Sequence, residues 1–297
     1  MFGFSKTLAG IDIGTKMLRA VRVRASAGRG SPTIEGYAEW PLPEGILLPS
    51  YTKENIADMK GFQDLLKLTL GTAGISSGDI SLSIPDQVVK VSFIEAKGVP
   101  KNRNEVLKFI KWKSKRSLPY DPEVAKIDYQ LMGDTAMAVF IKDDIVSNYE
   151  DALRSMSFRP KSVSTPSLNL FNLFSGKFGG HKEFALISVM EDHFAVTIVR
   201  DDYIDFYRST DVGYGDDRLM QEINSSILFY ANENPDVILK TVFLYTGTGD
   251  SKVLATHLSD STGMKVETLR LAEIIKGPAD VDVEPYGPAV AAALGSR

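Results

Sequence analysis

The sequence of 297 residues contains no cysteine and only three histidines. The missing thiols exclude disulfides, zinc–thiolate sites, iron–sulfur clusters and cysteine nucleophiles. His181, His193 and His257 lie far apart in the sequence, so we expect no histidine-based metal site. No apolar run reaches the roughly 20 residues that a membrane-spanning helix requires. The N-terminal sequence lacks the apolar segment and cleavage site of a signal peptide, so we expect a cytoplasmic protein.

The sequence also lacks an excess of positive charge. It has 34 Lys and Arg residues against 38 Asp and Glu residues, which gives a formal net charge of -4. Nonspecific binding of nucleic acids needs a basic surface, so we expect no nucleic-acid partner. The hydrophobic share of 43% and the charged share of 24% are typical of a globular protein with a sizeable core. The length suits two ordinary domains.

Hydrophobicity patterns predict the same order of elements twice. In the first half we expect strands over 7–13, 16–23 and 33–40, a helix from about Lys53, and a strand over 79–85. In the second half we expect strands over 183–190, 193–200 and 203–210, a helix over 216–231, and a strand over 240–247. Beyond these we expect a helix over 253–260, a strand over 264–268 and a small-residue helix over 288–296. The chain is therefore predicted to contain two structurally matching halves.

A separate pattern lies between the two halves. We expect a strand over 88–96, a helix over 102–118, a hairpin over 125–132 and 136–142, and a helix over 143–156. A glycine-rich hinge over 174–182 follows. We therefore divide the chain into a first subdomain (1–85), an inserted subdomain (86–160), a return to the first half with the hinge (161–182), and a second subdomain (183–297).

Two glycine-containing turns have the composition of nucleotide-binding loops. The first contains Asp12, Gly14, Thr15 and Lys16 between two strands. Its glycine permits close approach of an anion, its hydroxyl adds a donor, and Asp12 suits a hydrated Mg²⁺. On these residues alone, a plain hairpin turn is the favoured interpretation.

The second turn follows a buried strand and precedes a helix. It contains Gly247, Thr248 and Gly249. Such a turn suits a nucleotide at a helix N-terminus, or it is an ordinary connection with Asp250 or Ser251 as helix cap. Gly213 lies in a third glycine turn, for which we favour a simple lead into the next helix.

Taken together, these features resemble the actin-like ATPase superfamily. Within it the sequence is similar to the PilM-like proteins of the type IV pilus inner-membrane platform, which are related to FtsA and to the GspL cytoplasmic domain. Three stretches carry the likeness: FGFSKTLAGIDIGTKMLRAVRV; the insert, from IKWKSKRSLPYDPEVAKIDYQLM to NLFNLF; and EINSSILFYANENPDVILKTVFLYTGTGDS with PYGPAVAAALG. The resemblance implies an α/β, actin-like (ribonuclease H-like duplicated) fold with an inserted small α+β subdomain and a reduced second half.

The resemblance implies a set of nucleotide contacts, with ATP and Mg²⁺ as the ligands. The residues that match are Asp12, Gly14, Thr15, Lys16, Gly213, Gly247, Thr248 and Gly249, and Asp12 would hold the metal through a water.

Two departures from the family pattern argue against ATP hydrolysis. Ser188-Val189-Met190 stands where the family has Asp-x-Gly in its second phosphate loop. Asp192 nearby either replaces the lost acid or caps a turn, and we favour the turn cap. Only the helix over 216–231 and a short linker replace the subdomain that walls the nucleotide cleft, so the chain is short for this family by about one subdomain. An exposed site of this kind stabilises charge weakly. We therefore expect a degenerate ATPase and no catalytic residues.

The resemblance also implies a scaffold at the cytoplasmic face of the inner membrane, peripheral to it through a partner. That partner is the N-terminal cytoplasmic peptide of a PilN-like bitopic membrane protein, bound in a groove beside the insert, and the pilus assembly ATPase is a further one. Trp112, Pro119 and Tyr120 are candidate anchors, or core residues. Cations gather around the same helix: Lys101, Arg103, Lys108, Lys111, Lys113, Lys115 and Arg116.

Three alternatives stay open. The first is an active nucleotide-binding ATPase or small-molecule kinase of the same superfamily. The second is a GspL-like component of a type II secretion platform, which normally continues into a transmembrane helix. The third is a filament former, for which the sequence offers no test.

Overall fold

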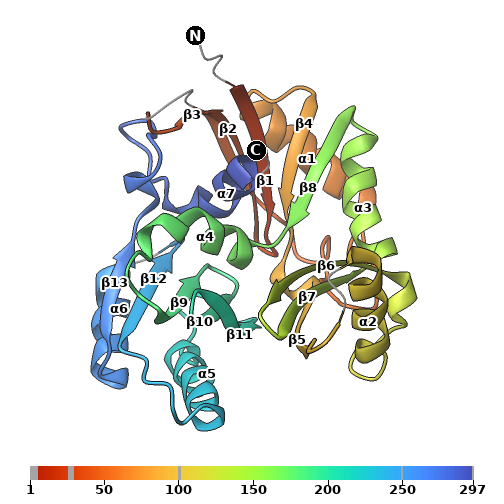
Figure 1. Ribbon diagram of the computed structural model, residues 1–297. Coiled ribbons are helices and arrows are strands. Elements are labelled where there is room, and N and C mark those ends of the chain that lie inside the picture. The colour runs from red at the N-terminus through yellow and green to blue at the C-terminus, as the bar shows by residue number, and fades with distance from the viewer. Residues whose placement is uncertain (1–5, 26–29, 100–101, 249, 296–297) are drawn as a thin grey trace, which may run out of the picture.

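A computed structural model describes residues 6–25, 30–99, 102–248 and 250–295. The chain forms three sheets (Figure 1). The first has the strand order β3-β2-β1-β4-β8, the second β11-β10-β9-β12-β13, and the third β5-β7-β6. The first two sheets have matching order and connectivity, so the predicted duplication is confirmed.

The first half and the second half each wrap helices around one of the five-stranded sheets. The elements of the first half are β1 (Lys6–Ile13), β2 (Met17–Ala25), β3 (Thr33–Pro41), α1 (Met59–Thr72), β4 (Gly78–Ser83), α3 (Asp143–Arg154) and β8 (Phe158–Ser164). Those of the second half are β9 (Glu183–Val189), β10 (Phe194–Arg200), β11 (Tyr203–Thr210), α5 (Leu219–Glu233), β12 (Thr241–Thr246), α6 (Ser251–Thr262) and β13 (Lys265–Leu269).

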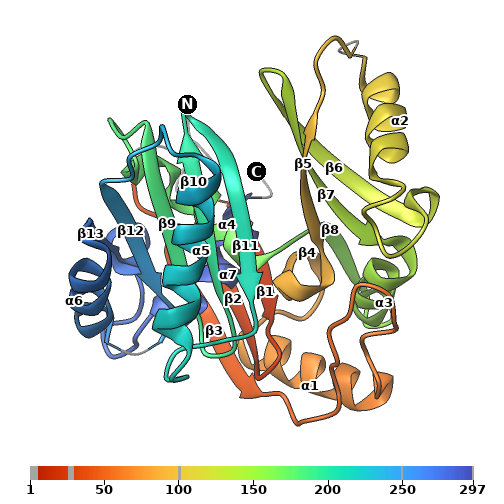
Figure 2. The ribbon, with the colours of Figure 1, turned by 90° about the horizontal axis from the view of Figure 1, so that it is seen from below.

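The insert stands beside the first half, across from the second sheet (Figure 2). It consists of the short 3-10 helix η1 (Asp86–Val88), β5 (Lys90–Glu95), α2 (Arg103–Ser114), β6 (Ala125–Met132) and β7 (Thr135–Lys142). Helix α2 covers one face of the three-stranded sheet, where Val106 and Ile110 pack against Ala138 and Phe140. The predicted hairpin of the insert is confirmed, with Gly133 in the left-handed conformation of its turn.

Helix α3 belongs to the core of the first sheet. Its Tyr149 lies edge-on to Phe62 of α1, with ring centroids 6.3 Å apart, and its Leu153 is fully buried in the same cluster. Strands β4 and β8 are parallel neighbours, and a parallel pair needs a crossover connection. Helix α3 is that crossover, as α6 is between β12 and β13. We therefore propose to end the insert at Lys142 rather than at residue 160.

Two helices fill the space between the five-stranded sheets. Helices α4 (Pro166–Phe174) and α7 (Gly287–Gly295) contribute to one core cluster that also includes side chains of both sheets. Helix α7 lies so close to β1 that a Cβ added at Gly10 would be 2.1 Å from the carbonyl oxygen of Ala289. This apolar core fixes the two halves against each other.

Several predicted boundaries are wrong, for local reasons. Helix α1 begins at Met59 and not near Lys53, because the amide of Asn55 bonds to the carbonyls of Ser50 and Lys53 and holds that segment as a loop. Asp58 then caps the helix. Helix α2 ends at Ser114, before the residue 118 that was expected.

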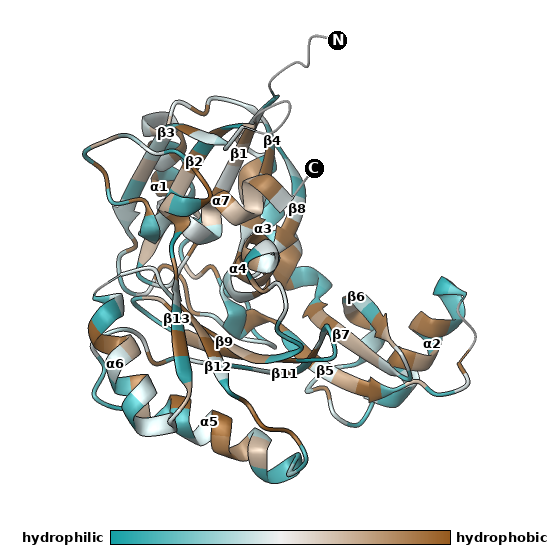
Figure 3. Cartoon of the chain, turned by 60° about the vertical axis from the view of Figure 1, so that its left-hand side comes forward, coloured by the Kyte–Doolittle hydropathy of each residue, from teal (hydrophilic) through white to brown (hydrophobic). Residues whose placement is uncertain are grey.

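The sequence pattern does not predict β8 and α4. Among the described residues, the most exposed of the large apolar side chains of the second half lie on and after α5, which forms the lower edge of the molecule in Figure 3. They include Leu228, Phe229 and Ile238.

Candidate functional site: a cleft closed by the chain itself

The β1–β2 turn of the first half meets the β9–β10 turn of the second half. Asp192 Oδ2 accepts hydrogen bonds from the Thr15 backbone nitrogen at 2.8 Å and from Thr15 Oγ1 at 2.6 Å. Lys16 Nζ donates to the carbonyl oxygen of Glu191 at 3.1 Å. The donors that would bind an anion in this turn therefore bind a carboxylate of the same chain.

A buried arginine adds a second connection between the halves. Arg19 of β2 pairs with Glu191 Oε1, and its Nε donates to Glu39 Oε2 at 3.0 Å. Burial alone would lower the pKa of Arg19, but the Glu191 carboxylate raises it, so the guanidinium keeps its charge. Glu191 and Asp192 thus both face cationic or donor groups of the first half.

The glycines of the second half lie beneath the same turn. A Cβ added at Gly213 would be 2.3 Å from the carbonyl oxygen of Glu191. A Cβ added at Gly247 would be 2.5 Å from the terminal methyl of Met190. Residues 190–193 therefore cover both glycines, Thr248 lies at the edge as a half-buried residue, and Gly249 falls outside the described residues.

Behind the turn, buried ionisable side chains contact one another in a row, and we call this row the chain of ionisable groups. Asp192 Oδ1 lies 2.7 Å from His193 Nδ1, and His193 Nε2 lies 3.2 Å from Asp86 Oδ2. Asp86 also accepts hydrogen bonds from Ser167 and, at 2.8 Å, from the Tyr207 hydroxyl. This chain joins the first half at Thr15, the second half at Asp192, His193 and Tyr207, and the insert at Asp86.

The charges of this chain are set by their neighbours. Burial opposes every charge here, yet hydrogen bonding and attraction to the two carboxylates hold the pKa of His193 well above its usual value. Burial would likewise raise the pKa of Asp86 and of Asp192, but His193 holds both below the ordinary range. His193 is therefore an imidazolium between two carboxylates.

Asp12, the candidate metal ligand, lies beside this network without joining it by a hydrogen bond at its Oδ1. Burial raises the pKa of Asp12 to about 7, so the carboxylate is poorly stabilised. The cavity that Asp12 lines together with Met190 and His193 has a volume of about 10 Å³. That is space for one water molecule at most, whereas Mg²⁺ in proteins usually keeps several waters.

The residues present do not fit Mg-ATP in this arrangement. Within the described ranges, no group of three or more His, Asp or Glu side chains is placed to hold a metal ion. The turn after β12 is a connection to α6, because Asp250 Oδ1 accepts a hydrogen bond from the Lys252 nitrogen at 2.8 Å and caps that helix. No step of phosphoryl transfer can be built on these groups.

The candidate partner-binding residues differ in how far their side chains are exposed to solvent. Trp112 on α2 is 67% exposed, with its ring centroid 5.9 Å from that of Phe109. Pro119 is exposed, whereas Tyr120 packs against the core of the insert and burial raises its pKa to about 12. These side chains belong to the α2 side of the insert sheet.

A groove lies on the other side of the insert sheet, between it and β8. Its volume is about 370 Å³. Its apolar lining comes from β7, α3, β8 and α4 and includes Val139, Ile141, Val146, Val163 and Leu168. A smaller cavity of about 190 Å³ also touches Val139 and Leu168, so the groove continues along α4.

Sequence reasoning misses the partners of the β9–β10 turn. Asp192 is expected to cap a turn, and that expectation is wrong because its carboxylate binds Thr15 and His193 instead. Asp86 and Glu191 carry no sequence signal of their role. A buried arginine in β2 and two adjacent acids in a tight turn are the signals that could have suggested an ion pair between the halves.

No protein-family model and no curated protein sequence matches this chain. Solved structures do match. A chain of the PilM–PilN type IV pilus biogenesis complex is 16% identical with a TM-score of 0.80, and the alignment covers 99% of each chain. A Bacteroides thetaiotaomicron protein with an actin-like ATPase fold is 10% identical with a TM-score of 0.57, covering 98% of this chain and 99% of that one. The chain has the actin-like fold.

A third similar structure is the cytoplasmic domain of EpsL, an inner-membrane component of the type II secretion system of Vibrio cholerae. It is 11% identical with a TM-score of 0.54, and the alignment covers 98% of this chain and 96% of that one. The expected fold class, an actin-like fold with α/β architecture, is therefore confirmed. In the part of the chain that the structure describes, no helix is long and apolar enough to cross a membrane.

We predict that His193→Gln destabilises the protein by about 3–5 kcal/mol at pH 7, because it leaves two buried carboxylates without their cation. The loss should shrink as the pH falls, since protonation of Asp86 and Asp192 removes their repulsion. Urea unfolding at several pH values measures this. The control is His257→Gln on the exposed side of α6, which should change stability by less than about 0.5 kcal/mol. Equal effects of both substitutions would refute the role of His193.

A second prediction concerns Asp12. Its pKa is raised from 3.8 to about 7, so the folded state binds a proton that the unfolded state releases. Stability should therefore fall as the pH rises from about 4 to 8. At about 1.4 kcal/mol per pKa unit, the rise amounts to about 4 kcal/mol. Asp12→Asn removes this dependence, and the stability of the variant relative to the wild type should grow over that interval. Parallel pH profiles of the two proteins would contradict the prediction.

Proposed function

We propose that this protein is an actin-like scaffold that binds a short cytoplasmic peptide of a PilN-like inner-membrane protein and does not hydrolyse ATP. The observation that supports the proposal is the position of residues 190–193. Asp192 binds the donors of Thr15, and Met190 lies against Gly247, two residues that we expected to contact a nucleotide. Because the protein's own backbone and side chains fill the cleft, we expect ligands to bind in its exposed grooves instead.

The absence of hydrolysis follows from what the reaction needs. Phosphoryl transfer depends on positioned metal ions and donors that neutralise the developing charge. Here the donors of Thr15 are bound to Asp192, and the only acid of the first turn, Asp12, is buried beside a cavity of about 10 Å³. Opening the cleft would break the contacts of Thr15, Lys16 and Arg19 with the β9–β10 turn together.

The groove between the insert and β8 supports the peptide-binding part of the proposal. Strand β8 is the last strand of the first sheet, so one of its edges is open to a further strand. An extended peptide added there would gain main-chain hydrogen bonds, and its alternate side chains would face the apolar groove. Lys126 and Glu150 at the groove provide polar groups for orientation.

The pairing with a PilN-like partner rests on the similarity to a chain of the PilM–PilN complex. The weaker similarity to the EpsL cytoplasmic domain favours a type II secretion platform as the second candidate, with the same kind of scaffold role. A cytoplasmic position at the inner membrane and an assembly ATPase as a further partner belong to the same proposal.

Calorimetric titration with the N-terminal cytoplasmic peptide of a PilN-like protein tests the function. We expect saturable binding that Ile141→Glu weakens by about tenfold or more, because a buried charge in the apolar groove costs over 1.4 kcal/mol. The matched control is Leu228→Glu on α5, an equal change at an exposed apolar residue far from the groove, which should leave binding unchanged.

The melting temperature of each variant shows whether it is folded. No heat with the PilN-like peptide, but binding of the corresponding peptide of a secretion-platform protein, would favour the second candidate. Binding of neither peptide would refute the proposal.

The ATPase part is tested separately by thermal melting with and without millimolar Mg-ATP. A ligand that binds only the native state must raise the melting temperature. We expect no shift and no phosphate release. A reproducible rise in the midpoint would mean that the β9–β10 turn leaves the cleft, and it would reject the closed cleft as the functional state.

A further inference from the structure

Helix α2 has an outward side that neither the cleft nor the peptide groove uses. Its buried residues recur every four positions along the side that meets the insert sheet: Val106, Ile110 and Ser114. The opposite side of the helix carries Lys108, Trp112 and Lys115, which are spaced by four and three residues and are all exposed. We call these three residues, with Arg116 directly after them, the outward face of α2.

The outward face of α2 lies at one end of the molecule. In Figures 2 and 3 the helix stands on the far side of the insert sheet from the second half, and no other described element lies beyond it. The surface is therefore a projecting helix and not a groove. A projecting helix can lie flat against an extended surface, as helices at membrane interfaces do.

Positive charge is concentrated on this helix. The segment 103–116 contains one acid, Glu105, and six cations, in a chain whose formal net charge is -4. The cations are Arg103, Lys108, Lys111, Lys113, Lys115 and Arg116. Within the described ranges only Lys111 among them forms an ion pair, with Glu123 Oε2 at 2.7 Å. The helix dipole favours the cations of the last turn, but it does not account for Lys108 in the middle of the helix.

An exposed tryptophan lies among these cations. Trp112 is 67% exposed, and Lys113 Nζ lies 5.5 Å from the centroid of its ring. The same ammonium lies 5.8 Å from the ring centroid of Phe109. Tryptophan rings prefer the headgroup level of a bilayer, where one part of the ring meets hydrocarbon and its N–H meets water. Lysine stems can lie along such an apolar layer while their charged ends stay at the level of the phosphates.

We propose that the outward face of α2 docks on the surface of an anionic phospholipid bilayer. Each Lys or Arg near such a surface strengthens binding, and the cations of this helix match its negative charge. An acidic protein partner would be expected to bury the Trp112 ring in a pocket of its own, whereas a bilayer accepts it on a flat interface. The inference goes beyond the proposed function, because the peptide groove lies on the other side of the insert sheet.

Co-sedimentation of the full chain with vesicles tests the docking. Vesicles of phosphatidylglycerol mixed with phosphatidylcholine are compared with vesicles of phosphatidylcholine alone, at about 50 mM salt, where screening is moderate. We expect binding to the mixed vesicles only. The test variant is Lys108→Gln combined with Lys115→Gln. Each cation at an anionic surface is worth about fivefold in binding, so this variant should bind about tenfold more weakly or less than that.

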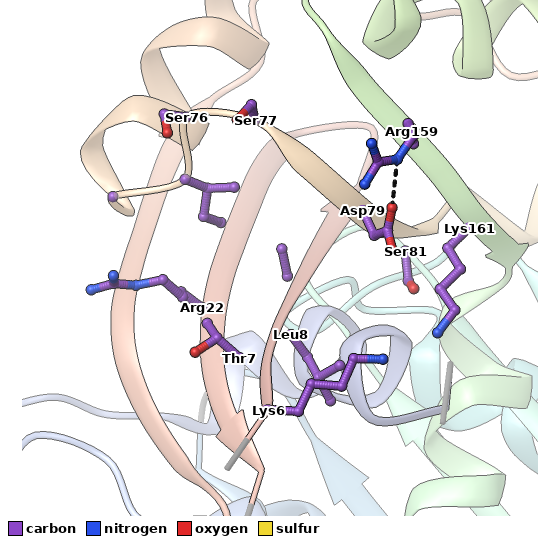
Figure 4. A pocket seen from close by; sticks show the side chains of 13 residues that line it. Lys6, Thr7, Leu8, Arg22, Ser76, Ser77, Asp79, Ser81, Arg159 and Lys161 are labelled. Carbon is purple, nitrogen blue, oxygen red and sulfur yellow. Dashed lines mark hydrogen bonds and ion pairs between the residues drawn. The ribbon is translucent and has the colours of Figure 1, made fainter. Parts of the chain in front are cut away.

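The control removes two exposed cations from another cationic region. Lys6→Gln combined with Arg159→Gln acts on the cavity of about 330 Å³ where β1, β4 and β8 begin (Figure 4). The ion pair of Arg159 with Asp79 is exposed and contributes little to stability. This control should bind the mixed vesicles as the wild type does, and both variants should keep the wild-type melting temperature. An equal loss in both variants would reduce the effect to net charge and overturn the proposal.

Fluorescence shows whether the helix itself meets the lipid. The chain has two tryptophans, Trp40 and Trp112, so Trp40→Phe leaves Trp112 as the reporter. We expect its emission to move to shorter wavelength with the mixed vesicles and to stay unchanged with phosphatidylcholine, because the ring leaves water for the interface. Trp112→Ser should weaken vesicle binding, and Leu228→Ser at an exposed residue of α5 should not.

Three results would each overturn the docking. They are failure of the wild type to bind the mixed vesicles, equal binding to both kinds of vesicle, and unchanged emission of Trp112. None of these measurements uses the PilN-like peptide, so a failure here is distinguishable from a failure of the proposed function.

Discussion

The imidazolium of His193 between Asp192 and Asp86 is the interaction on which the arrangement of the molecule depends. An isolated charge in the interior is expensive, and it is tolerated only when its partners stay in place. Asp192 and His193 both belong to the β9–β10 turn of the second half, whereas Asp86 begins the insert. Asp192 in turn binds Thr15 of the first half, so the same chain of contacts holds both halves and the insert. Separating the second half from the insert would break the ion pair of His193 with Asp86, and separating it from the first half would break the ion pair of Arg19 with Glu191.

This constraint gives the actin-like fold a different use. In a nucleotide-dependent protein, a ligand between the two halves would favour one relative position of the halves over another. It can do so only if its contacts with the protein differ between the two positions. In this chain the Asp192 carboxylate contacts Thr15 of the first half instead, and the methyl of Met190 covers Gly247. We call the two halves joined by these contacts the platform, and β8 with its groove lies at its edge.

The sequence predicts the strands well where apolar residues follow one another, as in β1, β9 and β10, or alternate with polar ones, as in β2, and the duplicated order follows from these strands. It does not predict β8, because FRPKSVS mixes charge and proline without a regular apolar face. The closing of the cleft is also beyond sequence reasoning. Thr15 and Asp192 are separated by 177 residues, and nothing local to either one names the other as partner. The sequence shows that Ser188 stands where the family has an acid. Only the fold shows that the Asp192 carboxylate binds the Thr15 donors that would otherwise bind a phosphate.

The insert is tied to this platform at its first residue. Asp86 begins η1, which follows β4 after Ile84 and Pro85, and it accepts hydrogen bonds from Tyr207 of β11 and Ser167 of α4. The groove beside β8 is bounded by the insert on one side and by the first sheet on the other, so its width depends on how the insert is held. A peptide in the groove and the imidazolium in the interior therefore stabilise the same orientation of the insert. By linkage, loosening the interior contact should weaken the groove for any peptide, even though His193 lines none of it.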